Sequence, residues 1–258
     1  MKKQELAKGI LHYKFDPRPG SVPTIGTDTC TAVVLNGKKA VLIDTGYESQ
    51  ASELLKDLAN SSIDIEAVII THFHDDHMEG LKFLPGIPVY GSGRFQETLD
   101  KWTPKEQHQH LTPTVVVSEP TTITFGEHTL TLIPSPGHSS CGLFVNIDNK
   151  FLHIADELMF SAEGNPKIPE LEYGNVEAHI NSLEKIKDYG KLSMILSHGP
   201  VIDNERAAAE IENRLIYLKA LLVSNRNISF EDATKDCTCA FVHDDSCHES
   251  NCWHDNKC

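Results

Sequence analysis

Short apolar and β-branched runs between turn residues predict β-strands through much of the chain. Asn36 and Gly37 separate two such runs, and this pair favours the tight turn of a β-hairpin. The alternation is clearest at residues 128–133, where Thr129 and Thr131 point to one face and the neighbouring leucines to the other. The predicted strands cover residues 30–35, 40–43, 67–70, 115–117, 128–133, 142–147 and 151–155.

Apolar residues at helical spacing predict helices between and after these strands. One helix is expected around residues 51–58, a second after an N-cap at Asn175, and the longest over residues 204–223. Because strands and helices alternate up to that point, we predict one α/β domain over residues 1–223, with helices packed outside sheets. Residues 224–258 are polar and rich in cysteine, and we expect them to form an appendage.

The charge balance narrows the classes of partner. The chain has 258 residues with 23 basic and 37 acidic side chains, a formal net charge of −14. Scattered lysines and arginines on an acidic chain argue against nucleic-acid binding. Apolar runs of only a few residues predict no membrane partner, and the first residues lack the apolar stretch of a secretory signal. We therefore expect a cytoplasmic protein with a small-molecule substrate, its oligomeric state left open with a dimer as one option.

The strongest chemical signal follows the predicted strand at residues 67–70. His72 and His74 are two residues apart and project to the same side of an extended backbone, and Asp76 and His77 come next, where the chain must turn. Imidazole nitrogens together with a carboxylate are the usual ligands of zinc and related metals. Surface histidines in a polar loop are the alternative, which this density of ligands directly after a buried strand disfavours.

Further donors are expected because one loop cannot complete the ligand shells of two metals. His138 follows a strand in a turn made by proline and glycine, Asp156 ends another apolar strand, and His198 follows a third apolar run. The carboxyl ends of strands are where α/β folds build their sites. These residues therefore join the loop histidines as candidate metal ligands.

Taken together, these segments resemble the motifs of the metallo-β-lactamase superfamily, whose fold is a four-layered αββα sandwich. The resembling segments occur in the expected order, at residues 41–46, 71–80, 137–138, 155–156 and 198–199. The resemblance implies two divalent metal ions, zinc first among the candidates, with manganese and iron as alternatives. It assigns the ligands by position: His72, His74 and His138 to one metal, Asp76, His77 and His198 to the other, and Asp156 as a bridge.

The same resemblance implies the chemistry. A hydroxide bridging the two metals would cleave a small ester, lactone, thioester or amide such as a β-lactam, with Asp76 as the catalytic residue that orients the water or shuttles its proton. Asp44 would lie behind the ligands, and a turn carboxylate at the end of a strand is the alternative for it. A mononuclear iron enzyme resembling the persulfide dioxygenases and a non-catalytic metal-binding sensor are the competing functions. The charge disfavours a phosphodiesterase or nuclease.

Several positions depart from the family pattern. Ala155 stands where glycine is usual before the bridging aspartate, Glu157 adds an acid after it, and residues 139–142 replace a commoner turn. These departures remove no ligand, but they disfavour the glyoxalase II branch. Tyr173 and Phe160 follow the bridging aspartate, where this family often contacts substrate, and simple loop packing is the alternative for both.

The C-terminal region has a second concentration of ligand-type residues, since five of the seven cysteines lie in the last 22 residues. A structural zinc site is the favoured interpretation for a reducing compartment, and disulfides or a loose thiol tail are the alternatives. The candidate residues are Cys237, Cys239, His243, Cys247, His248, Cys252, His254 and Cys258.

Overall fold

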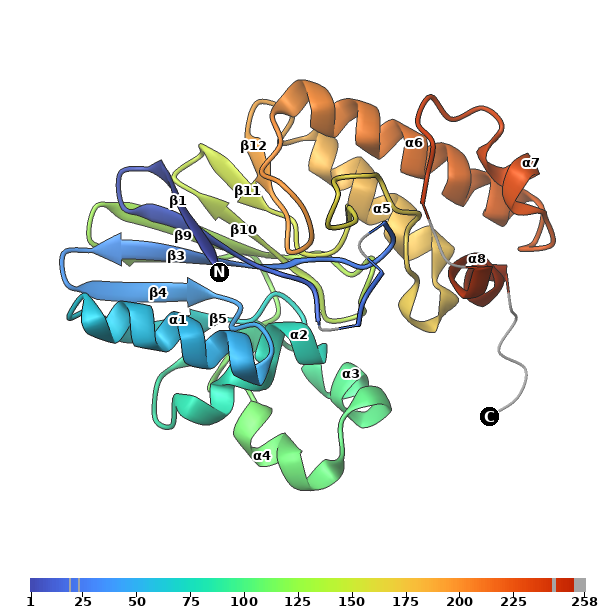
Figure 1. Ribbon diagram of the computed structural model, residues 1–258. Helices are drawn as coiled ribbons and strands as arrows, with labels where there is room; N and C mark the ends of the chain where they lie inside the picture. The colour runs from blue at the N-terminus through green and yellow to red at the C-terminus, as the bar shows by residue number, and fades with distance from the viewer. Residues whose placement is uncertain (19, 23, 243–244, 253–258) are drawn as a thin grey trace. The chain divides into compact units, whose positions relative to one another are not determined.

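The computed structural model describes residues 1–18, 20–22, 24–242 and 245–252 (Figure 1). The described backbone divides into two compact units. Unit 1 comprises Met1–Asp16, Thr29–Ser135 and Ser140–Asp148, and unit 2 comprises the described parts of Pro17–Asp28, Pro136–Ser139 and Asn149–Cys258. No described helix combines the length and the apolar composition that crossing a membrane requires.

A seven-stranded sheet forms the larger part of unit 1. Its strands follow one another in chain order, with antiparallel pairing from β1 to β4 and parallel pairing from β4 to β7. The predicted hairpin at Asn36 and Gly37 is confirmed, since Asn36 pairs with Lys39 across the turn and Gly37 has a φ of 62°. The strands are β1 (Lys2–Ala7), β2 (Ile10–Phe15), β3 (Thr29–Asn36), β4 (Lys39–Ile43), β5 (Asp64–Ile69), β6 (Val89–Ser92) and β7 (Val115–Val117).

The remaining strands belong partly to each unit. In unit 1, β8 (Thr121–Phe125), β9 (His128–Pro134) and β10 (Leu143–Ile147) pair antiparallel. The alternation predicted for β9 is confirmed, because Leu130 and Leu132 are completely buried while Thr129 is exposed. In unit 2, β11 (Phe151–His153) and β12 (Ser193–Ile195) pair in parallel.

The helices of unit 1 cover and extend its sheet. They are α1 (Glu48–Asn60), α2 (Asp75–Met78), α3 (Phe95–Trp102) and α4 (His108–Leu111), with two 3-10 turns, η1 (Glu79–Phe83) and η2 (Lys105–Gln107). Helix α1 runs along the sheet beside β4 (Figure 1) and buries Leu54 and Leu58 in the same core as Leu42 and Val68. The helix predicted around residues 51–58 is therefore confirmed.

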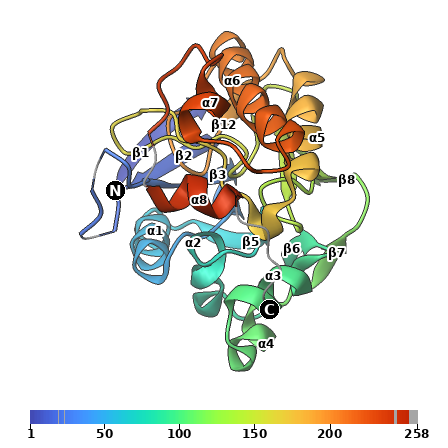
Figure 2. The ribbon, with the colours of Figure 1, turned by 90° about the vertical axis from the view of Figure 1, so that its right-hand side faces the viewer.

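Unit 2 is mainly helical. It contains η3 (Glu172–Gly174), α5 (Val176–Lys187), α6 (Asn204–Val223), α7 (Phe230–Thr234) and α8 (Asp245–Cys252), and Figure 2 shows α5 and α6 packed side by side. The Asn175 side chain accepts a hydrogen bond from the Ala178 amide at 3.0 Å, so the predicted N-cap is confirmed. The longest predicted helix is also confirmed, over residues 204–223.

The described part of the tail packs within unit 2. The Val242 amide donates to the Pro166 carbonyl at 2.9 Å, and the buried Asn251 amide group donates to the Pro169 carbonyl at 2.6 Å. No disulfide links any of the described cysteines. Over residues 224–242 and 245–252, no group of three His, Cys, Asp or Glu side chains could hold a metal ion. Three of the candidate tail ligands, His243, His254 and Cys258, lie outside the described residues, so the structural zinc site stays a prediction.

One ion-paired network in unit 1 predicts a pH dependence of stability. The Asp57 carboxylate accepts hydrogen bonds from Lys3 Nζ at 2.9 Å and from the Tyr13 hydroxyl at 2.8 Å. The hydrogen bond from Lys3, followed by that from Tyr13, lowers the pKa of Asp57 below its ordinary value of 3.8. A lowered folded-state pKa stabilises the fold above the unfolded value, and this stabilisation is lost as the pH falls through the lowered pKa.

We therefore expect Asp57→Asn to lower the free energy of unfolding at neutral pH and to make no difference in strong acid. Because Asp57 is partly exposed, the loss should be well below that of a buried pair. Urea denaturation of both proteins between neutral pH and the acid limit measures the difference. A gap between the two proteins that stays constant below pH 3.8 would contradict the assignment.

Candidate metal centre

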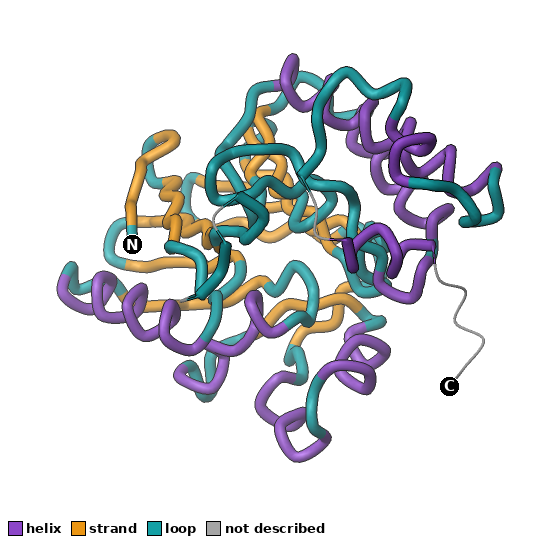
Figure 3. Tube along the Cα trace, turned by 45° about the vertical axis from the view of Figure 1, so that its right-hand side comes forward, coloured by secondary structure: helices purple, strands orange, loops and turns teal. Residues whose placement is uncertain are grey.

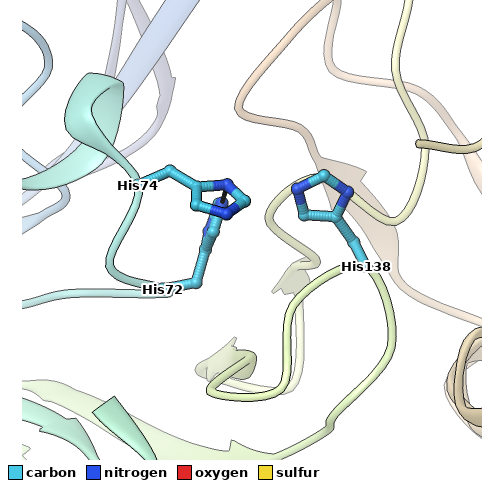
Figure 4. Close-up of side chains that lie close together, drawn as sticks. All are labelled: His72, His74 and His138. Carbon is cyan, nitrogen blue, oxygen red and sulfur yellow. Dashed lines mark hydrogen bonds between the residues drawn. The ribbon is translucent and has the colours of Figure 1, made fainter. Parts of the chain in front are cut away.

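One group of candidate ligands lies in unit 1, in the loop between β5 and α2. His72 and His74 leave this loop as neighbours (Figure 4), with His72 Nε2 and His74 Nδ1 2.9 Å apart and the rings edge to face. Two imidazole nitrogens on one tetrahedral zinc ion lie about 3.3 Å apart. The spacing of these two nitrogens therefore fits a shared metal ion, and the extended backbone predicted from the sequence accounts for it.

Asp44 makes hydrogen bonds that hold the same loop and orient one of its imidazoles. It follows β4 with a φ of 63°, is completely buried, and accepts hydrogen bonds from the Thr71 amide at 2.8 Å and the Thr71 hydroxyl at 2.7 Å. His77 Nδ1 lies 2.8 Å from Asp44 Oδ2, the same oxygen that accepts from the Thr71 hydroxyl. An ionised carboxylate only accepts, so Nδ1 carries the proton and Nε2 keeps the lone pair that a metal needs.

Asp76 lies beside this imidazole, at the start of α2. Its Oδ1 is 3.5 Å from His77 Nε2, and its side chain is partly exposed. A carboxylate in this position faces His77 Nε2, the nitrogen that Asp44 leaves with its lone pair. The two residues therefore present one oxygen and one nitrogen to the same small region of unit 1.

Another group of candidate ligands lies in unit 2, around Asp156. His198 Nε2 is 3.2 Å and His138 Nε2 is 3.7 Å from the same Asp156 oxygen, Oδ2. All three residues are buried. One carboxylate between two imidazoles is the arrangement expected of a ligand that bridges two metal ions.

Backbone carbonyls orient the two imidazoles of unit 2. His138 Nδ1 donates to the Glu170 carbonyl at 2.8 Å, and His198 Nδ1 donates to the Asp28 carbonyl at 2.5 Å. The Gly199 amide then donates to the Asp28 carboxylate at 2.8 Å, which secures the same contact. Since a carbonyl oxygen can only accept, both rings carry their proton on Nδ1 and present Nε2 as the lone-pair atom.

A buried pair, Glu157 and His179, supports the His138 loop. Glu157, noted as an extra acid, accepts a hydrogen bond from the His138 amide at 3.1 Å. Its other oxygen lies 3.0 Å from Nε2 of His179 on α5, and both side chains are buried. The sequence gives no sign of this pair, since nothing near His179 along the chain links it with Glu157.

Of the two predicted substrate contacts, Phe160 and Tyr173, the structure describes the side chain of Phe160 only. Phe160 is completely buried, with the guanidinium groups of Arg206 and Arg214 at 4.8 Å and 5.3 Å from its ring centre. These neighbours correspond to the packing alternative, and a substrate contact by Phe160 stays a prediction. Tyr173 lies in η3, and its side chain is outside what the structure describes.

The alanine before the bridging aspartate has a conformation that explains why glycine is usual there. Ala155 has a φ of 50°, in the left-handed region, and the strand β11 ends two residues earlier than predicted because the backbone turns here. A residue with a Cβ costs about 1–2 kcal/mol in this region. The turn is what carries the Asp156 side chain out of the strand direction.

We expect Ala155→Gly to raise the free energy of unfolding by about 0.5 kcal/mol. Relief of left-handed strain outweighs the larger unfolded-state entropy of glycine, which costs about 0.5–1 kcal/mol. The opposite sign is expected for Ala207→Gly, because Ala207 is buried inside α6. Thermal denaturation of both variants measures the two signs, and equal destabilisation would contradict the strain at Ala155.

Residues 25–198, more than half of the chain, match the family model described as the metallo-beta-lactamase superfamily. The chain belongs to the metallo-beta-lactamase superfamily. The resemblance inferred from the motifs is thereby confirmed.

Relatives and solved structures agree with this membership. The Beta-lactamase-like protein 2 homolog of Caenorhabditis elegans is 29% identical over 210 residues, 76% of this chain and 64% of that protein. The Hydroxyacylglutathione hydrolase of Yersinia pestis is 27% identical over 163 residues, 61% of this chain and 58% of that protein. The chain therefore spans less than two thirds of the length of these relatives. The second match is of the glyoxalase II type, the branch that the departures at Ala155 and residues 139–142 disfavour.

The similar structures confirm the fold class. A metallo-beta-lactamase from Pontibacter korlensis superposes with a TM-score of 0.66 at 20% identity, over 82% of this chain and 99% of that one. The structure of VMB-1 gives a TM-score of 0.65 at 20% identity, over 83% of this chain and 96% of that one. At this identity the likeness establishes the two-sheet α/β fold of the superfamily.

Proposed function

We propose that the chain is a metal-dependent hydrolase of a small acyl compound. The observation that carries the proposal is the orientation of three buried imidazoles, His77, His138 and His198. Each has its Nδ1 within hydrogen-bond distance of an oxygen acceptor in its own unit, which leaves Nε2 as the metal-binding atom. Protein groups that hold a ligand imidazole in this way are typical of metal sites, and a chance cluster of histidines has no need of them.

The donor set supports two divalent cations, with zinc as the first candidate and manganese or iron as alternatives. Imidazole and carboxylate ligands suit these metals. Asp156 is the proposed bridge, because one of its oxygens faces two imidazoles. By their positions in the family motifs, His72, His74 and His138 are proposed for one ion, and Asp76, His77 and His198 for the other.

The bound cations would supply Lewis acidity, which makes a water nucleophilic near neutral pH and polarises the carbonyl of the substrate. The protein would supply orientation and proton transfer. Asp76 is the proposed proton acceptor, since its carboxylate is partly exposed and lies beside His77 Nε2. Asp44 and Thr71 would hold His77 in the tautomer that leaves Nε2 available.

For the substrate we propose an ester, a lactone, a β-lactam or, first among them, a thioester. A thioester is supported by the relative named Hydroxyacylglutathione hydrolase, whose name describes hydrolysis of an acylated thiol. The formal charge of −14 favours small acyl compounds over polyanions such as nucleic acids.

A panel assay tests the proposal. Protein loaded with zinc or with manganese is offered an acyl-glutathione thioester, an acyl-homoserine lactone, a phenyl ester and a β-lactam, and chelator-treated protein is the control. We expect turnover of at least one acyl substrate that requires the metal. Protein that binds metal but leaves every substrate intact would favour a sensor, and oxygen-dependent consumption of a persulfide would favour the redox alternative.

A further inference from the structure

The described part of the C-terminal tail holds the segment that orients His138. We propose that helix α8 is a positioning element of the metal centre, which acts through Asn251 on residues 166–172 and through them on His138. This inference rests on the proposed function, because it treats His138 as a metal ligand. It assigns a role to a region that lies beyond the matched residues 25–198.

Residues 166–172 hold the His138 loop at three points. His138 Nδ1 donates to the Glu170 carbonyl at 2.8 Å, and the Glu172 amide donates to the His138 carbonyl at 3.0 Å. Next to it, the Ser139 hydroxyl donates to the Glu172 carboxylate at 2.5 Å. A shift of this segment would therefore move the acceptor that sets the ring orientation and tautomer of His138.

The segment has little regular structure of its own. Between β11 and η3 the chain runs as loop with isolated bridges, and loops are drawn in teal in Figure 3. A loop without a continuous hydrogen-bond ladder is held in place by contacts from other elements. For residues 166–172, several of these contacts come from the tail.

Asn251 provides the most direct of these contacts. Its side chain is buried, and its amide nitrogen donates to the Pro169 carbonyl at 2.6 Å and to the Tyr217 hydroxyl at 3.1 Å. The Asn251 carbonyl in turn accepts from Arg226 Nε at 2.5 Å. The Pro169 carbonyl belongs to the peptide group that precedes Glu170, so fixing it restricts the direction of the next carbonyl, which accepts from His138.

The hydrogen-bond chain beyond Asn251 has one consistent direction. His248 Nε2 lies 3.0 Å from the Ile228 carbonyl and must donate to it, so His248 Nδ1 accepts from the Tyr217 hydroxyl, also at 3.0 Å. Burial raises the pKa of Tyr217 well above its usual range, so the phenol keeps the proton that it donates. The Tyr217 hydroxyl oxygen accepts from the Asn251 amide nitrogen, and this contact orders the Asn251 side chain.

Two weaker tail contacts end on the same segment. The Val242 amide donates to the Pro166 carbonyl at 2.9 Å, and the Cys247 thiol lies 3.9 Å from the Glu170 carboxylate. The tail thus touches residues 166, 169 and 170. Because these contacts converge on the residues beside the His138 acceptor, the tail acts on the site by position and needs no zinc ion to do so.

Asn251→Asp in the full chain is the test, because it keeps the side-chain shape and removes the donor to Pro169. The probe is Co(II), titrated against a chelator, with its ligand-field spectrum recorded and thiolate binding recognised by sulfur-to-metal charge transfer. We expect the Co(II) dissociation constant of the site to rise roughly tenfold, the lower end of the effect of outer partners on a metal site. The ligand-field bands should shift at the same time.

Ser229→Ala is the matched control. Ser229 caps α7 in the same tail, where its hydroxyl accepts from the Asp232 amide at 3.1 Å, so the variant loses tail stability without touching residues 166–172. We expect wild-type Co(II) affinity and spectrum from it. An equal loss of Co(II) affinity in Ser229→Ala at the same loss of thermal stability would overturn the inference.

A second variant keeps the inference testable if Asn251→Asp does not fold. Tyr217→Phe removes only the hydroxyl that orders the Asn251 amide, and we expect a smaller weakening of Co(II) binding, roughly threefold. Wild-type affinity and spectrum in every folded variant would overturn the positioning role. A wild-type protein that binds no Co(II) would contradict the proposed function, and this inference with it.

Discussion

Replacing His138 by alanine is expected to remove bound metal and hydrolytic activity together. The variant deletes one proposed ligand and leaves the Glu170 carbonyl and one side of Asp156 without the imidazole that they contact. Since the metals would supply the nucleophile and the Lewis acid under the proposed mechanism, we expect turnover to fall by roughly a thousandfold or more. Elemental analysis after dialysis and the most active assay of the substrate panel give the two readings.

His128→Ala is the control for this loss. His128 is also buried, and its Nδ1 lies 2.8 Å from an aspartate oxygen, of Asp148, but it belongs to no proposed ligand set. We expect a comparable loss of stability with metal and activity retained. Full turnover by His138→Ala, or by wild-type protein stripped of metal, would contradict the proposed metal-dependent hydrolysis.

Asp44→Asn should reduce metal affinity and activity by roughly 10–100-fold, although the residue is not itself a proposed ligand. The Asp44 oxygen nearest His77 accepts from both His77 Nδ1 and the Thr71 hydroxyl. An amide nitrogen at that position would donate to His77 instead. The imidazole would then hold its proton on Nε2, where the metal should bind, so neutral His77 would present the wrong tautomer.

Asp148→Asn is a closely matched control. Asp148 has a φ of 57°, against 63° for Asp44, and it too accepts from a backbone amide, of Thr129, and lies 2.8 Å from a histidine Nδ1. The two variants therefore disturb the same kind of network in unit 1. We expect similar losses of thermal stability from both and a loss of metal only from Asp44→Asn. Equal metal affinity in the two variants would contradict the role assigned to Asp44.

The hydrophobic pattern predicted the buried strands and the longer helices well, and it missed elements whose stability comes from their surroundings. Strand β1 is an example, because four of its six residues are exposed and it lies at the edge of the sheet. Charged edge strands carry no apolar alternation to recognise. Helix α8 is another example, because it is polar throughout its length and has no apolar pattern to stand out.

The candidate ligands could be read from the linear order of the residues because their chemistry lies in the side chains themselves. Histidines and aspartates at strand ends, such as His72, His74 and Asp156, are visible in the sequence whatever the fold does around them. The turn at Ala155 was noticed as a departure, but its left-handed backbone became evident only in three dimensions. Family membership followed from the same side chains and their order.

The groups that orient those ligands were decided by tertiary structure alone. His138 and His198 donate to backbone carbonyls, which every residue possesses and which therefore leave no mark in a sequence. Glu157 and His179 are far apart along the chain, and folding brings their side chains to 3.0 Å. The Asn251 contact with Pro169 is of the same kind. Residue identity determines which atoms can bind a metal, whereas the fold determines which nitrogen of each imidazole is left to do so.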